Sequence, residues 1–271
     1  MMRIRTLLAV PLLLILAIPG HGLAQDAEQA AAPDMEPVMV GVFVDHVRPA
    51  MIPEYEAKIA EVVEKFQAAG VDAPAWDGFS SSELGYAYVI PASDLAGWSK
   101  VMEAFGSAVG ATETGANLAE ANLMSDHAEM HFWTIRPDMS YRPWDVGPPD
   151  EPYRHYTFWY GVQGRETEVE QLAKDFAALW AAHDLDDPWM VSQAMTGENL
   201  PVWLVISSAA SQAEYEARDA ATVAALGDEL VVLQTRALKL NRKINEASAM
   251  HRPELSYSGA METEEHVAGD E

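Results

Sequence analysis

Three side chains able to bind a metal ion or move a proton alternate along one short stretch, His127-Ala128-Glu129-Met130-His131. If this stretch is a β-strand, the two imidazoles and the carboxylate share one face, and neighbours on that face lie about 6.6 Å apart. A polar face on an edge strand explains the pattern more simply, because the matching positions of a later, similar segment are Lys243, Asn245 and Ala247, which are not a ligand set. We therefore expect no cofactor, and leave a metal ion or haem open.

Aromatic and polar residues alternate in a second stretch, residues 153–160. Alternation places His155, Thr157 and Trp159 on one face of a strand and Tyr156, Phe158 and Tyr160 on the other. An apolar cavity with a few polar groups is typical of a small-molecule site. We predict ligand binding by eight residues: His155, Trp159, Thr157, Tyr86, Tyr88, Trp203, His131 and Trp133. The alternative is that these rings fill a core between two sheets.

A short phrase occurs twice in the chain. Arg136-Pro137-Asp138-Met139-Ser140-Tyr141 returns 116 residues later as Arg252-Pro253-Glu254-Leu255-Ser256-Tyr257. Its arginine could pair with a carboxylate, its proline ends a strand, and its serine and tyrosine could anchor the turn that follows. Because both copies keep the phrase, we expect it to close each unit. An anion clamp at either arginine is the alternative.

Each copy of the phrase ends a segment with the same order of apolar runs. In the first segment we expect strands at 38–44, 84–90 and 129–135, and helices at 53–70, 93–110 and 112–125, with a turn-rich stretch at 74–82. In the second we expect strands at 153–160, 202–206 and 243–251, capping boxes at Thr167/Glu170 and Ser211/Glu214, and a helix at 228–242. His46 follows the first strand, where a loop is a reasonable place for function.

The order of elements predicts an α+β fold. Residues 38–141 and 153–257 each fit a ferredoxin-like βαββαβ repeat, joined by a proline-rich linker at 142–152. Helices on one face of such a sheet leave the other face apolar, so the sheet needs a partner. We predict two tandem repeats packed sheet-to-sheet as a fused, pseudo-dimeric α+β barrel.

This repeat and element order resemble the dimeric α+β barrel superfamily, which includes antibiotic-biosynthesis monooxygenases, NIPSNAP-like and EthD-like proteins and chlorite dismutase. The resemblance covers about residues 38–257. It implies the fold and a small molecule bound between sheet and helices. No catalytic motif of these families is matched, so the resemblance assigns no catalytic residue.

The first 24 residues indicate export. Arg3 and Arg5 precede an apolar run at 7–18 and a small-x-small site that ends at Ala24, which is typical of a signal peptide at 1–24. We expect a periplasmic or secreted protein without a membrane span after cleavage, a flexible leader at 25–37 and an acidic, disordered tail at 258–271.

Composition excludes several classes of protein. The net charge of −25 over 271 residues argues against a nucleic-acid partner, which requires a basic surface. The absence of cysteine excludes disulfides and thioether-linked haem. Motifs of serine hydrolases, nucleotide enzymes and zinc proteases are missing from the sequence.

The sequence favours a non-catalytic protein that binds a small apolar or aromatic molecule or has a structural role. The alternative is a cofactor-independent oxygenase or isomerase that resembles the antibiotic-biosynthesis monooxygenases, with His155 or His131 as base. A haem-binding enzyme is the third hypothesis. The oligomeric state is not defined by the sequence.

Overall fold

The computed structural model describes residues 37–81, 85–197 and 199–259. The predicted signal peptide, nearly all of the leader and most of the acidic tail lie outside these ranges. Within them, no helix combines the length and the apolar character that a membrane span requires.

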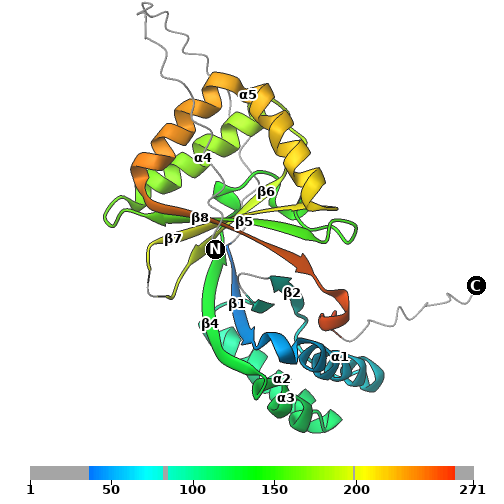
Figure 1. Ribbon diagram of the computed structural model, residues 1–271. Coiled ribbons are helices and arrows are strands. Elements are labelled where there is room, and N and C mark those ends of the chain that lie inside the picture. The colour runs from blue at the N-terminus through cyan, green and yellow to red at the C-terminus, as the bar shows by residue number, and fades with distance from the viewer. Residues whose placement is uncertain (1–36, 82–84, 198, 260–271) are drawn as a thin grey trace, which may run out of the picture. The chain divides into compact units, whose positions relative to one another are not determined.

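The described residues form eight β-strands and five α-helices (Figure 1). The first half contains β1 (Val38–Val47), α1 (Ile52–Ala69), β2 (Asp77–Ser81), β3 (Gly85–Ala92), α2 (Leu95–Thr112), α3 (Gly115–Asn122) and β4 (Ser125–Ile135). The second half contains β5 (Tyr153–Gly161), α4 (Glu166–Ala182), β6 (Trp189–Ala194), β7 (Val202–Ala209), α5 (Gln212–Leu240) and β8 (Asn241–His251). The mixed α+β class is as predicted.

The strands form one closed, antiparallel barrel in the order β1-β3-β2-β8-β5-β7-β6-β4. Each half contributes four neighbouring strands, and β4-β1-β3-β2 has the same internal order as β8-β5-β7-β6. The halves meet where β2 pairs with β8 and where β4 pairs with β6. These two junctions contain two and three residue pairs, whereas the pairings within each half contain five to ten.

Helices cover the outer face of each half of the barrel. Near β1 and β3, side chains of α1 and α2, among them Phe66 and Trp98, form one core, and α4 and α5 form a second core with Trp203 of β7. Figure 1 shows α4 and α5 together over the second half and α1, α2 and α3 beside the first. Among the described residues, no helix lies on the inner face of the strands.

The positions of two strands were not predicted, although the βαββαβ order requires them. Strand β2 lies in the stretch expected to be turn-rich, and its counterpart β6 follows Pro188. The sequence of β2, Asp-Gly-Phe-Ser-Ser, has weak strand propensity, but pairing with β3 on one side and β8 on the other stabilises it.

The helix boundaries also differ from expectation. Helix α4 begins at Glu166 without a side-chain cap, so the predicted box at Thr167 is wrong. Helix α2 begins at Leu95, two residues later than predicted, and the Asp94 side chain caps it. The helix expected at 228–242 is the end of the longer α5, which bends at Gly227. Ser211 caps α5 as predicted, accepting a hydrogen bond from the Glu214 backbone N at 3.2 Å.

The two arginine phrases contact the opposite halves of the protein. Arg252 follows β8 and donates to Glu56 of α1 at 2.7 Å and to Ser80 of β2 at 3.3 Å. In the same way Arg136 follows β4 and donates to Glu170 of α4 at 3.3 Å. It also donates to Gln193 of β6, the counterpart of β2.

The serine, tyrosine and apolar positions of the phrases repeat this exchange. The Ser256 hydroxyl accepts from the Gly78 backbone N, and the Ser140 hydroxyl accepts from the Val191 backbone N, both at 2.9 Å. Tyr257 forms a β-bridge with Trp76, and Tyr141 forms one with Trp189. Leu255 is buried in the first core and Met139 in the second. The sequence predicted that each phrase closes its own unit. In the structure, each phrase instead joins its unit to the other one.

We expect Arg252→Met and Arg136→Met each to lower the free energy of unfolding by about 1–3 kcal/mol. Each substitution leaves a partly buried carboxylate, that of Glu56 or Glu170, without its arginine partner. Urea denaturation measures the loss. Arg165→Met is the matched control: this arginine lies on the surface with Glu168, one turn away, and its loss should cost less than about 1 kcal/mol. Equal effects at all three positions would contradict a junction role.

The ion pair between Arg252 and Glu56 predicts that the stability of the fold depends on pH. The hydrogen bond from Arg252 lowers the pKa of Glu56 from its ordinary value of 4.5. The stabilisation is then complete above pH 4.5 and is lost as the pH falls through the lower pKa of the folded state. The effect of Arg252→Met, measured by denaturation at several pH values, should shrink in acid.

Gly41 of β1 leaves space for a ring of α2. A Cβ at this position would lie 2.4 Å from ring carbons of Trp98, so Gly41→Ala should destabilise the fold by about 1–3 kcal/mol. The control is Gly106→Ala within α2, where a Cβ meets nothing within 4 Å. Thermal denaturation should show that variant unchanged or stabilised by up to about 1 kcal/mol.

Candidate functional site

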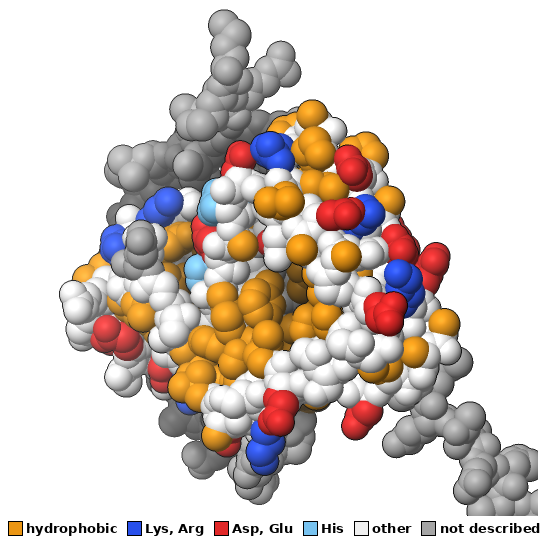
Figure 2. Space-filling model, turned by 90° about the horizontal axis from the view of Figure 1, so that it is seen from below, with side chains coloured by type: hydrophobic (Ala, Val, Ile, Leu, Met, Phe, Trp, Pro, Cys, Tyr) orange, Lys and Arg blue, Asp and Glu red, His pale blue; other side chains and the backbone are white. Residues whose placement is uncertain are grey.

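The barrel encloses a cavity, the lumen, with a volume of about 470 Å³. Residues from seven of the eight strands line it, together with the loop that connects β6 to β7. Most of the lining is apolar, and Figure 2 shows a hollow of hydrophobic side chains with histidines beside it. An eight-stranded barrel has an interior that side chains can just fill or that can hold one small ligand.

Small side chains leave the lumen open. Along β1 every second residue points inward, and three of these are Val40, Val42 and Val44. Ala87 and Ala247 line it from β3 and β8. Larger rings occupy only part of the wall: Trp133 of β4 and Phe158 of β5 contact each other across the halves, with ring centroids 6.5 Å apart. The space that remains is accessible to a ligand.

Of the eight residues predicted to bind a ligand, two line the lumen, His131 and Trp133. The other six are not among the lining residues: His155, Thr157, Trp159, Tyr86, Tyr88 and Trp203. The alternation along β5 was assigned correctly, but the cavity lies on the opposite face, with Tyr156, Phe158 and Tyr160.

Contacts with the helices explain the position of the outward-facing residues. The ring of His155 stacks on Tyr215 of α5 with centroids 4.3 Å apart, and burial lowers the pKa of His155. Trp159 packs on Phe176 of α4 at 5.7 Å. His155 is thus separated from the lumen by its own strand, and the geometry does not support it as a base acting there.

The predicted tyrosines of β3 belong to hydrogen-bond networks under α1. The Tyr55 hydroxyl donates to Asp45 at 2.6 Å and lies 2.9 Å from the Tyr88 hydroxyl. Burial raises the pKa of Asp45. The Tyr86 hydroxyl donates to Glu56, and burial together with this bond raises the pKa of Tyr86 to about 12. Both tyrosines have the partners expected of polar groups in a core.

Three histidines and one carboxylate form a cluster on β1 and β4. Pairing of these strands sets His46 directly opposite His127, and Val44 opposite Glu129. The imidazoles of His46 and His127 stack with centroids 4.0 Å apart. His46, Glu129 and His131 also line the lumen, so the cluster lies at its wall.

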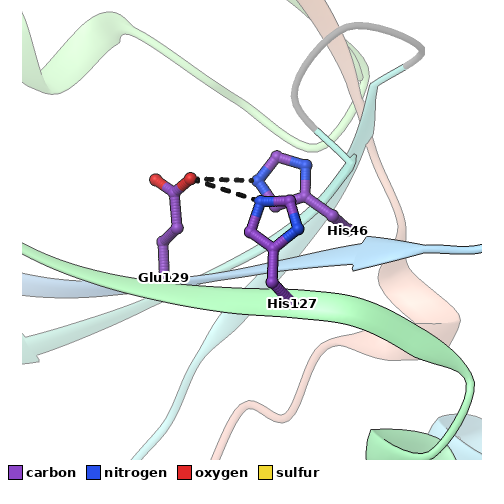
Figure 3. Close-up of side chains that lie close together, drawn as sticks. All are labelled: His46, His127 and Glu129. Carbon is purple, nitrogen blue, oxygen red and sulfur yellow. Dashed lines mark ion pairs between the residues drawn. The ribbon is translucent and has the colours of Figure 1, made fainter.

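Glu129 contacts all three imidazoles. Its Oε1 lies 3.4 Å from His46 Nε2 and 3.6 Å from His127 Nε2 (Figure 3). Its Oε2 lies 2.8 Å from His131 Nε2, and that hydrogen bond lowers the pKa of Glu129. The carboxylate is therefore charged at neutral pH.

The residues that come together at Glu129 Oε1 differ from the predicted set of His127, Glu129 and His131. His127, Glu129 and His131 do share one face of β4, but His131 contacts the carboxylate oxygen that faces away from His127. The second imidazole at Oε1 is that of His46, which is 81 positions earlier than His127 in the chain. The pairing of the first and last strands of a βαββαβ unit was the signal that could have brought His46 into the set.

No protein-family model and no curated protein matches the sequence. Several solved structures match the fold. A candidate monooxygenase from Fusobacterium nucleatum is 11% identical, with 83% of this chain and 96% of the other aligned and a TM-score of 0.53. An anthrone oxidase-like protein is 14% identical, with 81% and 92% aligned and a TM-score of 0.52. A chlorite dismutase variant from Candidatus Nitrospira defluvii is 8% identical, with 80% and 92% aligned and a TM-score of 0.50.

Structural matches at such low sequence identity establish the architecture and show nothing about the reaction. These neighbours belong to the superfamily that the internal repeat resembles, and they align with at least four fifths of the chain. The chain therefore has the dimeric α+β barrel fold.

Proposed function

We propose that the protein binds a small, uncharged and largely apolar molecule inside the barrel lumen. The observation that carries this proposal is a cavity of about 470 Å³ with a mainly apolar wall, within the range of about 300–1,000 Å³ typical of small-molecule sites. Small residues on several strands keep the space open, and both halves contribute to the wall.

The wall also defines the chemistry of the ligand. The rings of Trp133, Phe158 and Tyr160 favour a flat or aromatic molecule, because rings pack well against rings. Glu246 lines the cavity, and the chain has a net charge of −25, so an anionic ligand would be repelled. His131 and Asn245 offer hydrogen bonds to one or two polar groups of the ligand.

A catalytic role is the second candidate, as a cofactor-independent oxygenase or isomerase. Its specific support is that His131 lines the lumen and is hydrogen-bonded to Glu129 at 2.8 Å. A carboxylate that orients an imidazole is the usual arrangement of a histidine base. The names of two neighbours, a monooxygenase and an anthrone oxidase-like protein, are consistent with such a role but share only the fold. A haem-binding role stays a prediction.

We also infer that residues 38–141 and 153–257 are tandem ferredoxin-like repeats, and that the protein is exported. The identical strand order of the halves and the reciprocal contacts of the two phrases support the first inference. The charged, apolar and small-residue segments within residues 1–24 support the second.

Ligand binding is tested with N-phenyl-1-naphthylamine, a neutral aromatic probe whose fluorescence rises in apolar surroundings. Ala247→Phe adds a ring to the lumen wall and should weaken probe binding at least tenfold. Ala217→Phe adds the same ring on the exposed surface of α5 and should leave binding unchanged. Thermal denaturation of both variants checks that the barrel is intact. Equal probe binding by folded Ala247→Phe and the parent protein would overturn the proposal.

A further inference from the structure

Three possible metal-ligand atoms lie close together beside the lumen: His46 Nε2, His127 Nε2 and Glu129 Oε1. All three lie within 4.8 Å of one another, and they come from two paired strands (Figure 3). The carboxylate oxygen is 3.4 Å and 3.6 Å from the two nitrogens. Bare lone pairs at such distances repel one another, so a proton or a cation must lie between them.

Glu129 itself provides the comparison that separates these two possibilities. Its other oxygen lies 2.8 Å from His131 Nε2, the normal length of a charge-assisted hydrogen bond. The contacts to His46 and His127 are longer by more than half an ångström. His46 Nε2 is buried and forms no hydrogen bond to any of the described residues. Protons shared with the carboxylate do not account for these distances.

A metal ion accounts for them better. A tetrahedral ion with bonds of about 2.0–2.1 Å holds its ligand atoms about 3.3–3.4 Å apart, close to the two separations at Glu129 Oε1. The His46 and His127 rings are stacked 4.0 Å apart and inclined by 12°, which disfavours two protonated imidazoles because their charges would repel. Because a metal ion lies in the plane of each imidazole that binds it, both rings must tilt toward Glu129 Oε1 to share one ion.

We propose that His46, His127 and Glu129 bind one divalent transition-metal ion at the wall of the lumen. Two imidazoles and one carboxylate suit Zn²⁺, Co²⁺ or Fe²⁺, whereas Mg²⁺ and Ca²⁺ prefer a site made of oxygen atoms. Three protein ligands leave a coordination position for water or for a molecule in the lumen, the arrangement found in catalytic rather than structural zinc sites.

His131 is a positioning residue in this site. Its hydrogen bond to Glu129 Oε2 holds the carboxylate so that Oε1 faces the other two histidines. Partners of this kind orient ligands without touching the metal. The site does not depend on a ligand in the lumen, so it can be tested independently of the proposed function.

The test uses the untagged protein, freed of metal with a chelator. Titration with Co²⁺, followed by its visible absorption, should show one saturable site per chain with the spectrum of a four- or five-coordinate ion. Calorimetry with Zn²⁺ gives the affinity. We expect His46→Ala, His127→Ala and Glu129→Gln each to weaken Zn²⁺ binding at least about 100-fold, and His131→Ala to weaken it about 10- to 100-fold.

His183→Ala is the matched control. His183 is partly exposed and lies 3.2 Å from a single carboxylate, that of Glu229, so its loss should not change Zn²⁺ affinity. Zn²⁺ should raise the Tm of the parent protein and of His183→Ala, but not of His127→Ala, whose apo form should unfold like the parent because His127 is 58% exposed. Absence of a saturable site, or an equal loss of affinity in His183→Ala, would overturn the proposal.

Discussion

Closure of the barrel depends on the reciprocal contacts between its two halves. The strand junctions are short, two residue pairs between β2 and β8 and three between β4 and β6. Next to each junction an arginine phrase crosses to the other half, where its arginine bonds a helix carboxylate and its serine bonds a backbone amide. Hydrogen bonds to charged groups are stronger than neutral ones, and here they act where the backbone pairing is sparse. The lumen exists only while both junctions are closed.

The repeated phrase and the order of apolar runs were sufficient to predict the class of fold and the barrel. They were not sufficient to place β2 and β6, because short strands with polar or mixed sequences are stabilised by their neighbours rather than by their own residues. The repeated phrase is evident in the sequence, but the residues of the opposite half that it contacts could not be predicted. Contacts between Arg252 and Glu56 span 196 positions, and nothing in the local pattern around either residue identifies the other.

The candidate site could be predicted only in part, for a related reason. In β5 both faces carry aromatic side chains, one against helices and one toward the lumen, so alternation separates the two faces without showing which of them faces the lumen. The pattern on β4 was clearer, since His127, Glu129 and His131 are polar among apolar neighbours. Its completion by His46 required the pairing of β1 with β4. The equivalent positions of β8, Lys243, Asn245 and Ala247, carry no such set, so the two halves share an architecture and differ in their chemistry.

The central proposal is that the lumen, with its apolar wall and the histidine–carboxylate cluster at its edge, holds one small molecule. Native mass spectrometry of the protein purified from its own source, without added ligand or chelator, tests this claim most directly. The account predicts a mass above that of the polypeptide by one small organic molecule, released when the protein is unfolded. The mass of the polypeptide alone, from protein with an intact cooperative unfolding transition, would contradict it.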